Sequence, residues 1–294
     1  MATKKKTPEG AQKEDVNQVG EQVVSMKEVI PESDAVTTSS PEPVILKAQD
    51  HTSVVIPYSK ELAQGKELLY ALRSWQKNVR FGINVVVIGD RENWFSEDIT
   101  FIEHPCVSDN PQADTMAKLI LAMSSPDVTE RFIWTNDDIY LVNPVGLAHI
   151  EIPKVLGKLD PGKHSGAYST NMMLTEQLLN DAKFPRLNYG THTPFLFEKE
   201  KLSTMLEMFP EMLTGSYLFS SVYFNSMAYP SYPILLDWPT DQVLLPIVSK
   251  TPDEQKVKEL LSRKVFLNNS ESGYSPWLED FLGRLFPEAS DFEE

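Results

Sequence analysis

The sequence predicts an α/β fold with a mostly parallel central sheet flanked by helices, followed by an irregular helical C-terminal half. The first supporting observation is the order strand, helix, strand, strand, helix, strand in the first half. A helix between two strands carries the chain back to the end of the sheet at which the first strand began, so the two strands run parallel. The second observation is that polar residues directly follow several of these strands. Ligand sites of open α/β sheets lie at such strand ends.

The first three elements follow from apolar patterns. Ser53–Tyr58 reads as a short buried strand, which Pro57 is expected to halt because proline donates no hydrogen bond to a ladder. Lys66–Lys77 predicts a helix, since leucines and a tryptophan recur near one face. Ile83–Asp90 is a β-branched run that ends in Gly-Asp and predicts the second strand.

The next elements extend the same alternation. Thr100–Ile102 predicts a short strand. Ala113–Met123 predicts a helix, because methionine, leucine and isoleucine recur at steps of three and four residues. Phe132–Thr135 predicts a buried strand, and a further helix is expected to begin near Lys199.

Composition limits the class of protein. The chain has 294 residues, enough for one large or two small domains, and a net charge of −15 that argues against general nucleic-acid binding. Its single cysteine, Cys106, excludes an intrachain disulfide and fits a reducing compartment. No run of about 18 apolar residues and no secretory signal is present, so we expect no membrane span and a cytoplasmic location.

The chain divides into a tail and a body. Residues 1–48 are rich in Lys, Glu, Gln, Ser, Thr and Pro and lack aromatic residues, so we expect a disordered N-terminal tail. Within it, the apolar residues between Val23 and Ile30 suggest a short helical docking motif. Residues 49–294 are expected to form a single folded domain.

The most informative segment is Asn136–Asp138, which interrupts an apolar run. Adjacent carboxylates are costly to bury unless a positive charge lies against them. A hard divalent cation, Mg²⁺ or Mn²⁺, supplies that charge and often brings substrate phosphates. If the strand continues through the segment, Asn136 and Asp138 share one face and Asp137 takes the other. The alternative is a strand-end turn in which Asp137 and Asp138 cap local amides.

Two other polar positions also follow predicted strands. Tyr58 and Asp90 lie at the carboxyl ends of their strands, as Asn136 does. Because parallel strands present these ends at one edge of the sheet, the three positions are expected to converge. The sequence therefore favours a metal-dependent nucleotide site, with metal ligands Asp137 and Asp138, over the turn interpretation.

A histidine stands in a loop of the second half. His192 lies among Gly, Thr and Pro residues, ahead of the predicted helix at Lys199. Such a histidine serves as a general base, a phosphate partner or a metal ligand, or it simply hydrogen-bonds to backbone. The segment Leu236–Gln242 carries two further carboxylates, for which turn chemistry is expected.

These residues resemble the Stealth family of sugar-phosphate transferases, which make bacterial capsular polysaccharides and include the lysosomal enzyme-targeting phosphotransferase. The resemblance spans roughly residues 53–294, and its fairly specific parts are the Arg-Phe-Ile…Asn-Asp-Asp string and the Phe-Pro-Glu…Phe-Glu ending. The segments similar to the family blocks are Glu67–Asn78, Val85–Ile88, Thr129–Asp138, His192–Phe195 with the helix Lys201–Phe209, Val265–Ser270 and Leu285–Glu293.

The resemblance implies a nucleotide-sugar-binding domain similar to the GT-A glycosyltransferase fold, and transfer of a hexose-1-phosphate from a nucleotide-sugar donor to a hydroxyl of a carbohydrate or glycosylated acceptor. Asp137 and Asp138 would hold the metal or donor phosphates, and Arg73 would lie near the donor pyrophosphate. His192 would lie near the reacting hydroxyl, and Asn268 would match a polar site residue.

The sequence also departs from the family pattern. The segments Val54–Lys60, Asn110–Asp114 and Ser220–Asn225 stand where the family has other residues, including a histidine and an arginine expected to contact phosphate. Lys118, on a predicted helix beside the nucleotide end, is a candidate substitute. Ordinary GT-A-type glycosyl transfer to a polysaccharide, a protein or a modified nucleobase is therefore an alternative. A non-catalytic interaction protein that retains the fold is another.

Overall fold

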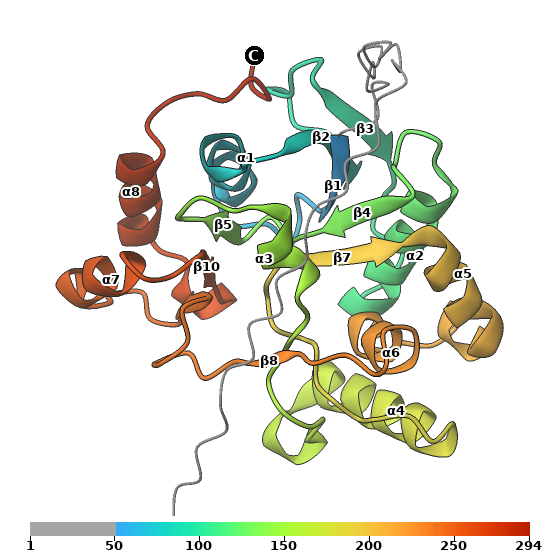
Figure 1. Ribbon diagram of the computed structural model, residues 1–294. Helices are drawn as coiled ribbons and strands as arrows, with labels where there is room; N and C mark the ends of the chain where they lie inside the picture. Colours follow the sequence, from blue (N-terminus) through green and yellow to red (C-terminus); the bar gives the residue numbers. More distant parts are fainter. Residues whose placement is uncertain (1–50) are drawn as a thin grey trace, which may run out of the picture. The chain divides into compact units, whose positions relative to one another are not determined.

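The computed structural model describes residues 51–294, so the predictions of a disordered tail over 1–48 and of a docking motif between Val23 and Ile30 fall outside the described residues. Its main sheet has five strands, and only the last runs antiparallel to its neighbour (Figure 1). In spatial order these are β3 (Ile99–Glu103), β2 (Gly82–Gly89), β1 (His51–Tyr58), β4 (Arg131–Trp134) and β7 (Phe195–Glu198). The predicted α/β class with a mostly parallel sheet is confirmed.

The strand order reverses beside β1. From β1 the chain moves outward to β2 and β3 and then returns to the other side of β1 as β4. In open α/β sheets such a reversal leaves a crevice beyond the carboxyl ends of the two flanking strands, and ligands bind there. The crevice of this protein therefore lies beyond Tyr58 of β1 and Trp134 of β4.

Pro57 does not halt β1, which corrects the expectation from sequence. The ladder between β1 and β4 ends at the pair Val55–Trp134, and the carbonyl of Val55 accepts the amide of Thr135 at 3.1 Å. Pro57 stands two residues further and directs its nitrogen to that same side, where β4 has already ended, so no ladder bond is lost. On its other edge β1 stays paired with β2 as far as Tyr58.

The two predicted helices of the first half cover opposite faces of the main sheet. Helix α1 (Glu67–Asn78) packs Leu72 and Trp75 against one face, and α2 (Pro111–Ser124) packs Met116 and Leu119 against the other. The Asn110 side chain caps α2 by accepting the Gln112 amide at 3.1 Å. Both helices are amphipathic, so burying their apolar faces stabilises the sheet between them.

The second half is mostly helical and irregular, as predicted, but it also builds small sheets that the sequence pattern did not reveal. One orders three strands as β5–β10–β9, and another pairs two short strands in parallel. The strands are β5 (Ile139–Leu141), β6 (Lys154–Val155), β8 (Ile234–Leu235), β9 (Leu244–Ile247) and β10 (Phe266–Asn269). The helices are α3 (Leu147–Glu151), α4 (Gly166–Asp181), α5 (Lys199–Met208), α6 (Phe219–Ser226), α7 (Glu254–Leu261) and α8 (Pro276–Leu285), with 3₁₀ turns at Pro161–Lys163, Pro210–Leu213 and Glu271–Gly273.

The Asn136–Asp138 segment joins the two larger sheets. Strand β4 ends at Trp134 and β5 begins at Ile139, with Asp137 and Asp138 in a turn between them. The strand does not continue through the segment, so the alternation that a continued strand would impose is not observed, and the two carboxylates lie in a turn at the strand end. The turn places this segment at the junction of the main sheet and the small β5–β10–β9 sheet.

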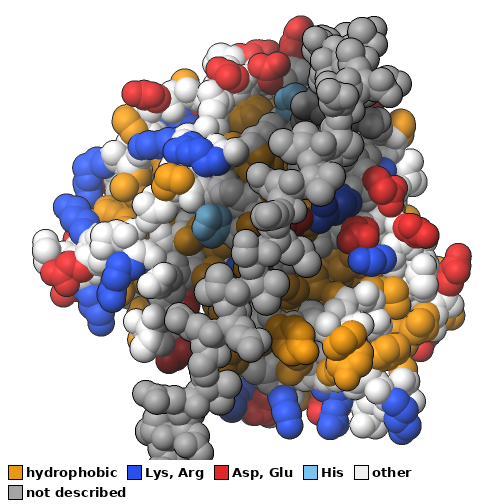
Figure 2. Space-filling model, viewed as in Figure 1, with side chains coloured by type: hydrophobic (Ala, Val, Ile, Leu, Met, Phe, Trp, Pro, Cys, Tyr) orange, Lys and Arg blue, Asp and Glu red, His pale blue; other side chains and the backbone are white. Residues whose placement is uncertain are grey.

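Charged side chains of both signs lie on the visible surface. On the face shown in Figure 2, Lys and Arg side chains are interspersed with Asp and Glu and form no single broad basic surface. Among the helices between residues 51 and 294, none is both long enough and apolar enough to cross a bilayer.

Candidate functional site

A cavity of about 390 Å³ lies at the crevice beyond β1 and β4, and we call it the strand-end pocket. This volume falls within the range of small-molecule sites. The polar residues in its wall come from both sheets and from both helices that flank the main sheet. They are Tyr58, Ser59, Gln64, Glu67, Asp114, Thr115, Lys118, Asn136, Asp137, Asp138, Asn269 and Glu271.

The carboxyl groups of Asp137 and Asp138 lie in this wall uncompensated, since neither forms an ion pair with a described residue. Burial, the charge of Asp138 and the charge of Glu67 together hold the pKa of Asp137 well above its usual range. Burial and Glu67 raise the pKa of Asp138 to about 7. The Oδ1 atom of Asp138 is buried without a hydrogen-bond partner. An orphaned carboxylate oxygen of this kind indicates a site for a cation or a proton.

These two aspartates fit a hard divalent cation that takes its remaining ligands from substrate and water. No cluster of three or more His, Cys, Asp or Glu side chains within residues 51–294 is arranged to hold a metal ion alone. Magnesium is commonly bound by one or two protein carboxylates plus substrate phosphates. The aspartate pair supplies that number of oxygen ligands, with the unpartnered Oδ1 of Asp138 among them.

A chain of hydrogen bonds in the pocket wall holds another carboxylate, that of Glu67, in place. The Asn269 amide donates to Oε1 of Glu67 at 2.7 Å, and the hydroxyl of Tyr140 donates to Oδ1 of Asn269 at 2.9 Å. The backbone amide of Gln64 donates to Oε2 of Glu67 at 2.8 Å. Sequence reasoning did not identify Glu67 or Asn269 as site residues. The sequence feature that could have identified Asn269 is the Asn-Asn pair at the end of an apolar run, because polar residues also end the apolar runs at Tyr58, Asp90 and Asn136.

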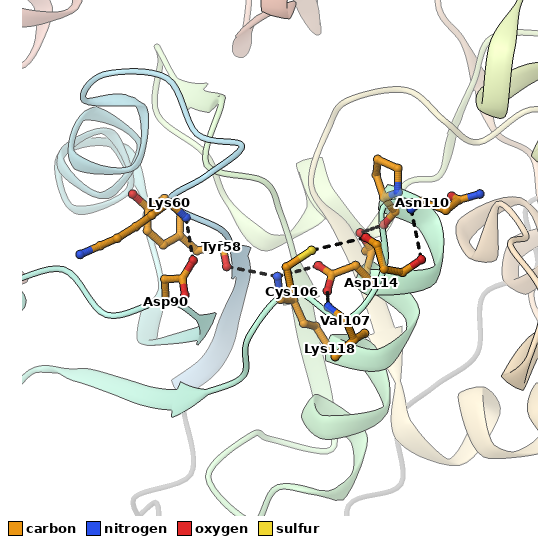
Figure 3. A network of polar contacts seen from close by, with 11 residues as sticks. Tyr58, Lys60, Asp90, Cys106, Val107, Asn110, Asp114 and Lys118 are labelled. Atoms are coloured by element: carbon orange, nitrogen blue, oxygen red, sulfur yellow. Dashed lines mark hydrogen bonds and ion pairs between the residues drawn. The ribbon is translucent and has the colours of Figure 1, made fainter.

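Lys118 is the only Lys or Arg among the described residues that line the strand-end pocket. Its Nζ donates to Oδ2 of Asp114 at 2.7 Å and to the carbonyl oxygen of Tyr58 at 3.1 Å, as Figure 3 shows. Burial raises the pKa of Asp114, but hydrogen bonds from Lys118 and from the amide of Val107 outweigh it and leave that pKa below its usual range. The ammonium thus ties α2 to the end of β1 at the wall of the pocket.

Tyr58 and Asp90 lie close to one another at the strand ends. Tyr58 lines the strand-end pocket, and its hydroxyl donates to Oε1 of Glu92 at 2.7 Å. Burial and the nearby acidic groups raise the pKa of Tyr58 far above its usual range. Asp90 does not line the pocket. Its Oδ2 accepts the backbone amide of Lys60 at 2.8 Å and so holds the loop that follows β1 (Figure 3).

His192 lines a second, adjoining cavity of about 130 Å³, which we call the histidine pocket. Its wall includes Trp134, Thr135 and Phe219, and it shares Asn136 with the strand-end pocket. The hydroxyl of Thr135 is buried without a hydrogen-bond partner. The two cavities therefore adjoin at the residue that opens the Asn136–Asp138 turn.

The backbone and electrostatics of His192 are unusual. Its φ of 46° lies in the left-handed region, where non-glycine residues are uncommon and where strain often accompanies function. The side chain is exposed and lines the cavity, where desolvation by the neighbouring protein lowers its pKa. A lowered pKa favours the neutral imidazole, which is the form that accepts a proton.

Besides Asp90, two predicted site residues lie apart from the aspartate pair. Arg73 does not line the strand-end pocket, because its guanidinium is bound to the C-terminal segment. Its Nη2 and Nε donate to the Glu293 carboxylate at 2.6 and 2.9 Å, and its Nη1 donates to the carbonyl of Phe286 at 3.2 Å. Asn268 lines a third cavity, which it shares with His192. The structure thus brings together Tyr58, Lys118 and Asn136–Asp138, with His192 adjoining, and leaves out Arg73.

No family model and no curated protein matches the chain. Among solved structures, the chain is similar to the apo-form glycosyltransferase GlyE of Streptococcus pneumoniae TIGR4, with 10% sequence identity and a TM-score of 0.40. The match covers 81% of this chain and 60% of the GlyE chain, so this chain spans less than two thirds of the length of GlyE. The resemblance to the Stealth family is not confirmed by these comparisons.

Proposed function

We propose that this protein is a nucleotide-sugar-dependent glycosyltransferase that uses a divalent cation, Mg²⁺ or Mn²⁺, and acts on a carbohydrate or glycosylated acceptor. The observation that carries the proposal is the uncompensated carboxylate pair, Asp137 and Asp138, in a cavity of suitable size where the strand order reverses. This is the position at which open α/β sheets bind nucleotides.

The donor diphosphate would lie in the strand-end pocket. A cation bound by Asp137 and Asp138 would neutralise negative charge that develops on the leaving phosphate. Lys118 would donate the third hydrogen of its Nζ to a phosphate oxygen, since the other two engage Asp114 and Tyr58. Tyr58 and Ser59, which line this pocket at the end of β1, would contact the nucleoside.

The acceptor would lie in the histidine pocket. His192 would take the proton of the acceptor hydroxyl, a role that requires the neutral imidazole favoured by its lowered pKa. A correctly placed general base contributes about 10²–10⁴-fold in rate. Asn136, which lines both cavities, would contact donor and acceptor at their junction.

The distribution of cations favours transfer of the sugar over transfer of a hexose-1-phosphate. In the latter reaction the phosphoryl group itself passes to the acceptor, and its charge must be neutralised on both sides. No Lys or Arg between residues 51 and 294 lines the histidine pocket, and Arg73 is bound to Glu293. Hexose-1-phosphate transfer, which the Stealth resemblance implies, is therefore the second candidate.

Phosphorus NMR of the full chain tests the proposal directly. The protein is incubated with UDP-, GDP- and CMP-sugars and Mg²⁺ or Mn²⁺, with water as a surrogate acceptor. The Asp138→Asn variant is compared with Asp98→Asn, which makes the same change at an exposed position outside the pockets. We expect release of nucleoside diphosphate by the wild type and Asp98→Asn, and loss of turnover in Asp138→Asn.

Each outcome has a definite meaning. Release of nucleoside monophosphate with sugar phosphate would establish hexose-1-phosphate transfer instead. Undiminished turnover by folded Asp138→Asn would remove the aspartate pair from the mechanism. No turnover of any donor by the wild type would contradict the transferase proposal and favour an interaction protein that retains the fold.

A further inference from the structure

A third cavity, of about 300 Å³, shares Gly190, Thr191 and His192 with the histidine pocket, and we call it the tryptophan pocket. His192 lines both cavities and so stands at their boundary. Leu236, Asp237 and Trp238 form one wall, and Asn268 of β10 contributes to another. The Trp238 side chain is 41% exposed, which is unusual for the largest aromatic residue and places its ring within reach of a ligand.

Strand β10 separates this cavity from the strand-end pocket. Consecutive residues of a strand point to opposite faces, and Asn268 lines the tryptophan pocket while Asn269 lines the strand-end pocket. Directly paired residues point to the same face. Asn268 pairs with Pro246, another residue of the tryptophan pocket, and with Ile139, a residue of the histidine pocket. The tryptophan and histidine pockets therefore share one face of the small sheet, and the proposed donor site has the other.

The segment that carries Trp238 is fixed before any ligand arrives. The carbonyl oxygen of Asp237 accepts hydrogen bonds from the backbone amides of Thr240 and Asp241, both at 2.8 Å. Its Oδ2 accepts the Thr240 hydroxyl at 2.8 Å, and these contacts confirm the predicted turn. The ammonium of Lys264, only 1% exposed, donates to the Trp238 carbonyl at 2.7 Å and to the Asp241 backbone. A platform held in this way loses little entropy when it binds a ligand.

The lining of the cavity selects an uncharged ligand with one apolar face. No Lys or Arg of the described chain lines it, so phosphates and carboxylates find no counter-charge there. The Asn268 side chain is 5% exposed and its Oδ1 has no hydrogen-bond partner, so it is a buried acceptor that a hydroxyl donor would satisfy. A sugar ring has this combination, because its C–H face stacks on an aromatic ring while its hydroxyls bind amides and carboxylates.

We propose that the tryptophan pocket is a second acceptor subsite, which binds the sugar unit next to the one that reacts in the histidine pocket. The acceptor is then an oligosaccharide or polysaccharide of at least two units rather than a free monosaccharide. This assignment rests on the proposed glycosyl transfer for the identity of the neighbouring site. Binding of a sugar by Trp238 and Asn268 is nevertheless a separate property that is measured without donor or metal.

Fluorine NMR of protein labelled with 5-fluorotryptophan reports each pocket separately. Of the five tryptophans, Trp134 lines the histidine pocket and Trp238 the tryptophan pocket, while Trp75 lies in the core as an internal control. Single Trp→Phe variants assign the resonances. The probes are glucose and N-acetylglucosamine, the disaccharides maltose, cellobiose and chitobiose, and the corresponding tetrasaccharides, each at ~10 mM so that a Kd of ~1 mM gives near saturation.

We expect monosaccharides to shift Trp134 alone and at least one oligosaccharide to shift both Trp134 and Trp238, with Kd lower by about 10-fold. Asn268→Ala should raise that oligosaccharide Kd by about 10-fold, whereas Asn93→Ala, at an exposed position, should leave it unchanged. Absence of any Trp238 shift, or equal affinity for monosaccharides and oligosaccharides, would overturn the subsite.

The outcomes of the two experiments are separable. A Trp238 shift without turnover in phosphorus NMR would retain the sugar site and reject the transferase. Turnover without a Trp238 shift would retain the transferase and reject the subsite.

Discussion

Replacing Lys118 with methionine should destabilise the protein strongly, because it strands a buried carboxylate. Lys118 and Asp114 form an ion pair at 2.7 Å in which the side chains are only 2% and 5% exposed. Methionine keeps the length of the side chain but removes the charge and both hydrogen bonds to Asp114 and Tyr58. Loss of one partner of a buried pair costs about 3–5 kcal/mol, so we expect a decrease of that size in the free energy of unfolding at pH 7.

Urea unfolding followed by tryptophan fluorescence measures this decrease. The matched control is Lys163→Met, which breaks an ion pair with Asp160 at 3.0 Å whose side chains are 78% and 48% exposed. Exposed pairs contribute about 0–1 kcal/mol, so this variant should remain near wild type. A double variant that also carries Asp114→Asn should recover part of the loss, because the buried charge is then absent.

A loss below about 1 kcal/mol in Lys118→Met, equal to that in Lys163→Met, would refute this reasoning. It would mean that Asp114 is hydrated or protonated when unpaired. Failure of Asp114→Asn to recover stability in the double variant would instead assign the cost to the lost contact with the Tyr58 carbonyl.

Three further predictions follow from the same structure. Asp138 has a pKa raised from 3.8 to about 7, so ionisation opposes folding increasingly as pH rises through that window. Metal-free wild type should therefore be less stable at about pH 8 than at about pH 5, by at most about 3 kcal/mol, whereas Asp138→Asn should lack this decrease; equal pH profiles in urea unfolding would contradict it. Arg73→Met should lower stability by about 2–4 kcal/mol through loss of the Glu293 pair, with nucleotide-sugar affinity unchanged by calorimetry; a tenfold weaker affinity would return Arg73 to the donor site. Gly89→Ala should cost about 2–4 kcal/mol in thermal unfolding, because φ is +145° and a Cβ would overlap the Tyr58 carbonyl oxygen; a stability within about 0.5 kcal/mol of wild type would disprove the constraint.

Local patterns predicted the framework of the first half well. The predicted helix Lys66–Lys77 is observed as Glu67–Asn78, and the predicted strand Phe132–Thr135 as Arg131–Trp134. These elements bury one apolar face each, so their periodicity is visible in the sequence. Pro57 was misread because the effect of a proline depends on whether a neighbouring strand lies on its nitrogen side, which only the sheet order reveals.

The candidate site was predicted in part. The Asn136–Asp138 segment and His192 stood out because charged or polar residues interrupt apolar runs or occupy a Gly/Pro-rich loop. Glu67 was not recognised, since a glutamate at the start of a helix looks like an ordinary first-turn acid. Arg73 lies apart from the aspartate pair because it is bound to Glu293, a partner 220 positions away in the chain that the resemblance did not identify.

The sequence by itself determined that parallel strands end in polar residues and that Asp137 and Asp138 are costly to bury, because periodicity and charge are local properties. The tertiary structure alone decided which of these residues share a cavity. It assigned Asn268 and Asn269 to opposite faces of a small sheet whose strands are brought together from residues 139–141, 244–247 and 266–269. Pairing between such distant segments depends on chain closure and core packing, and neither is encoded in any one stretch of the sequence.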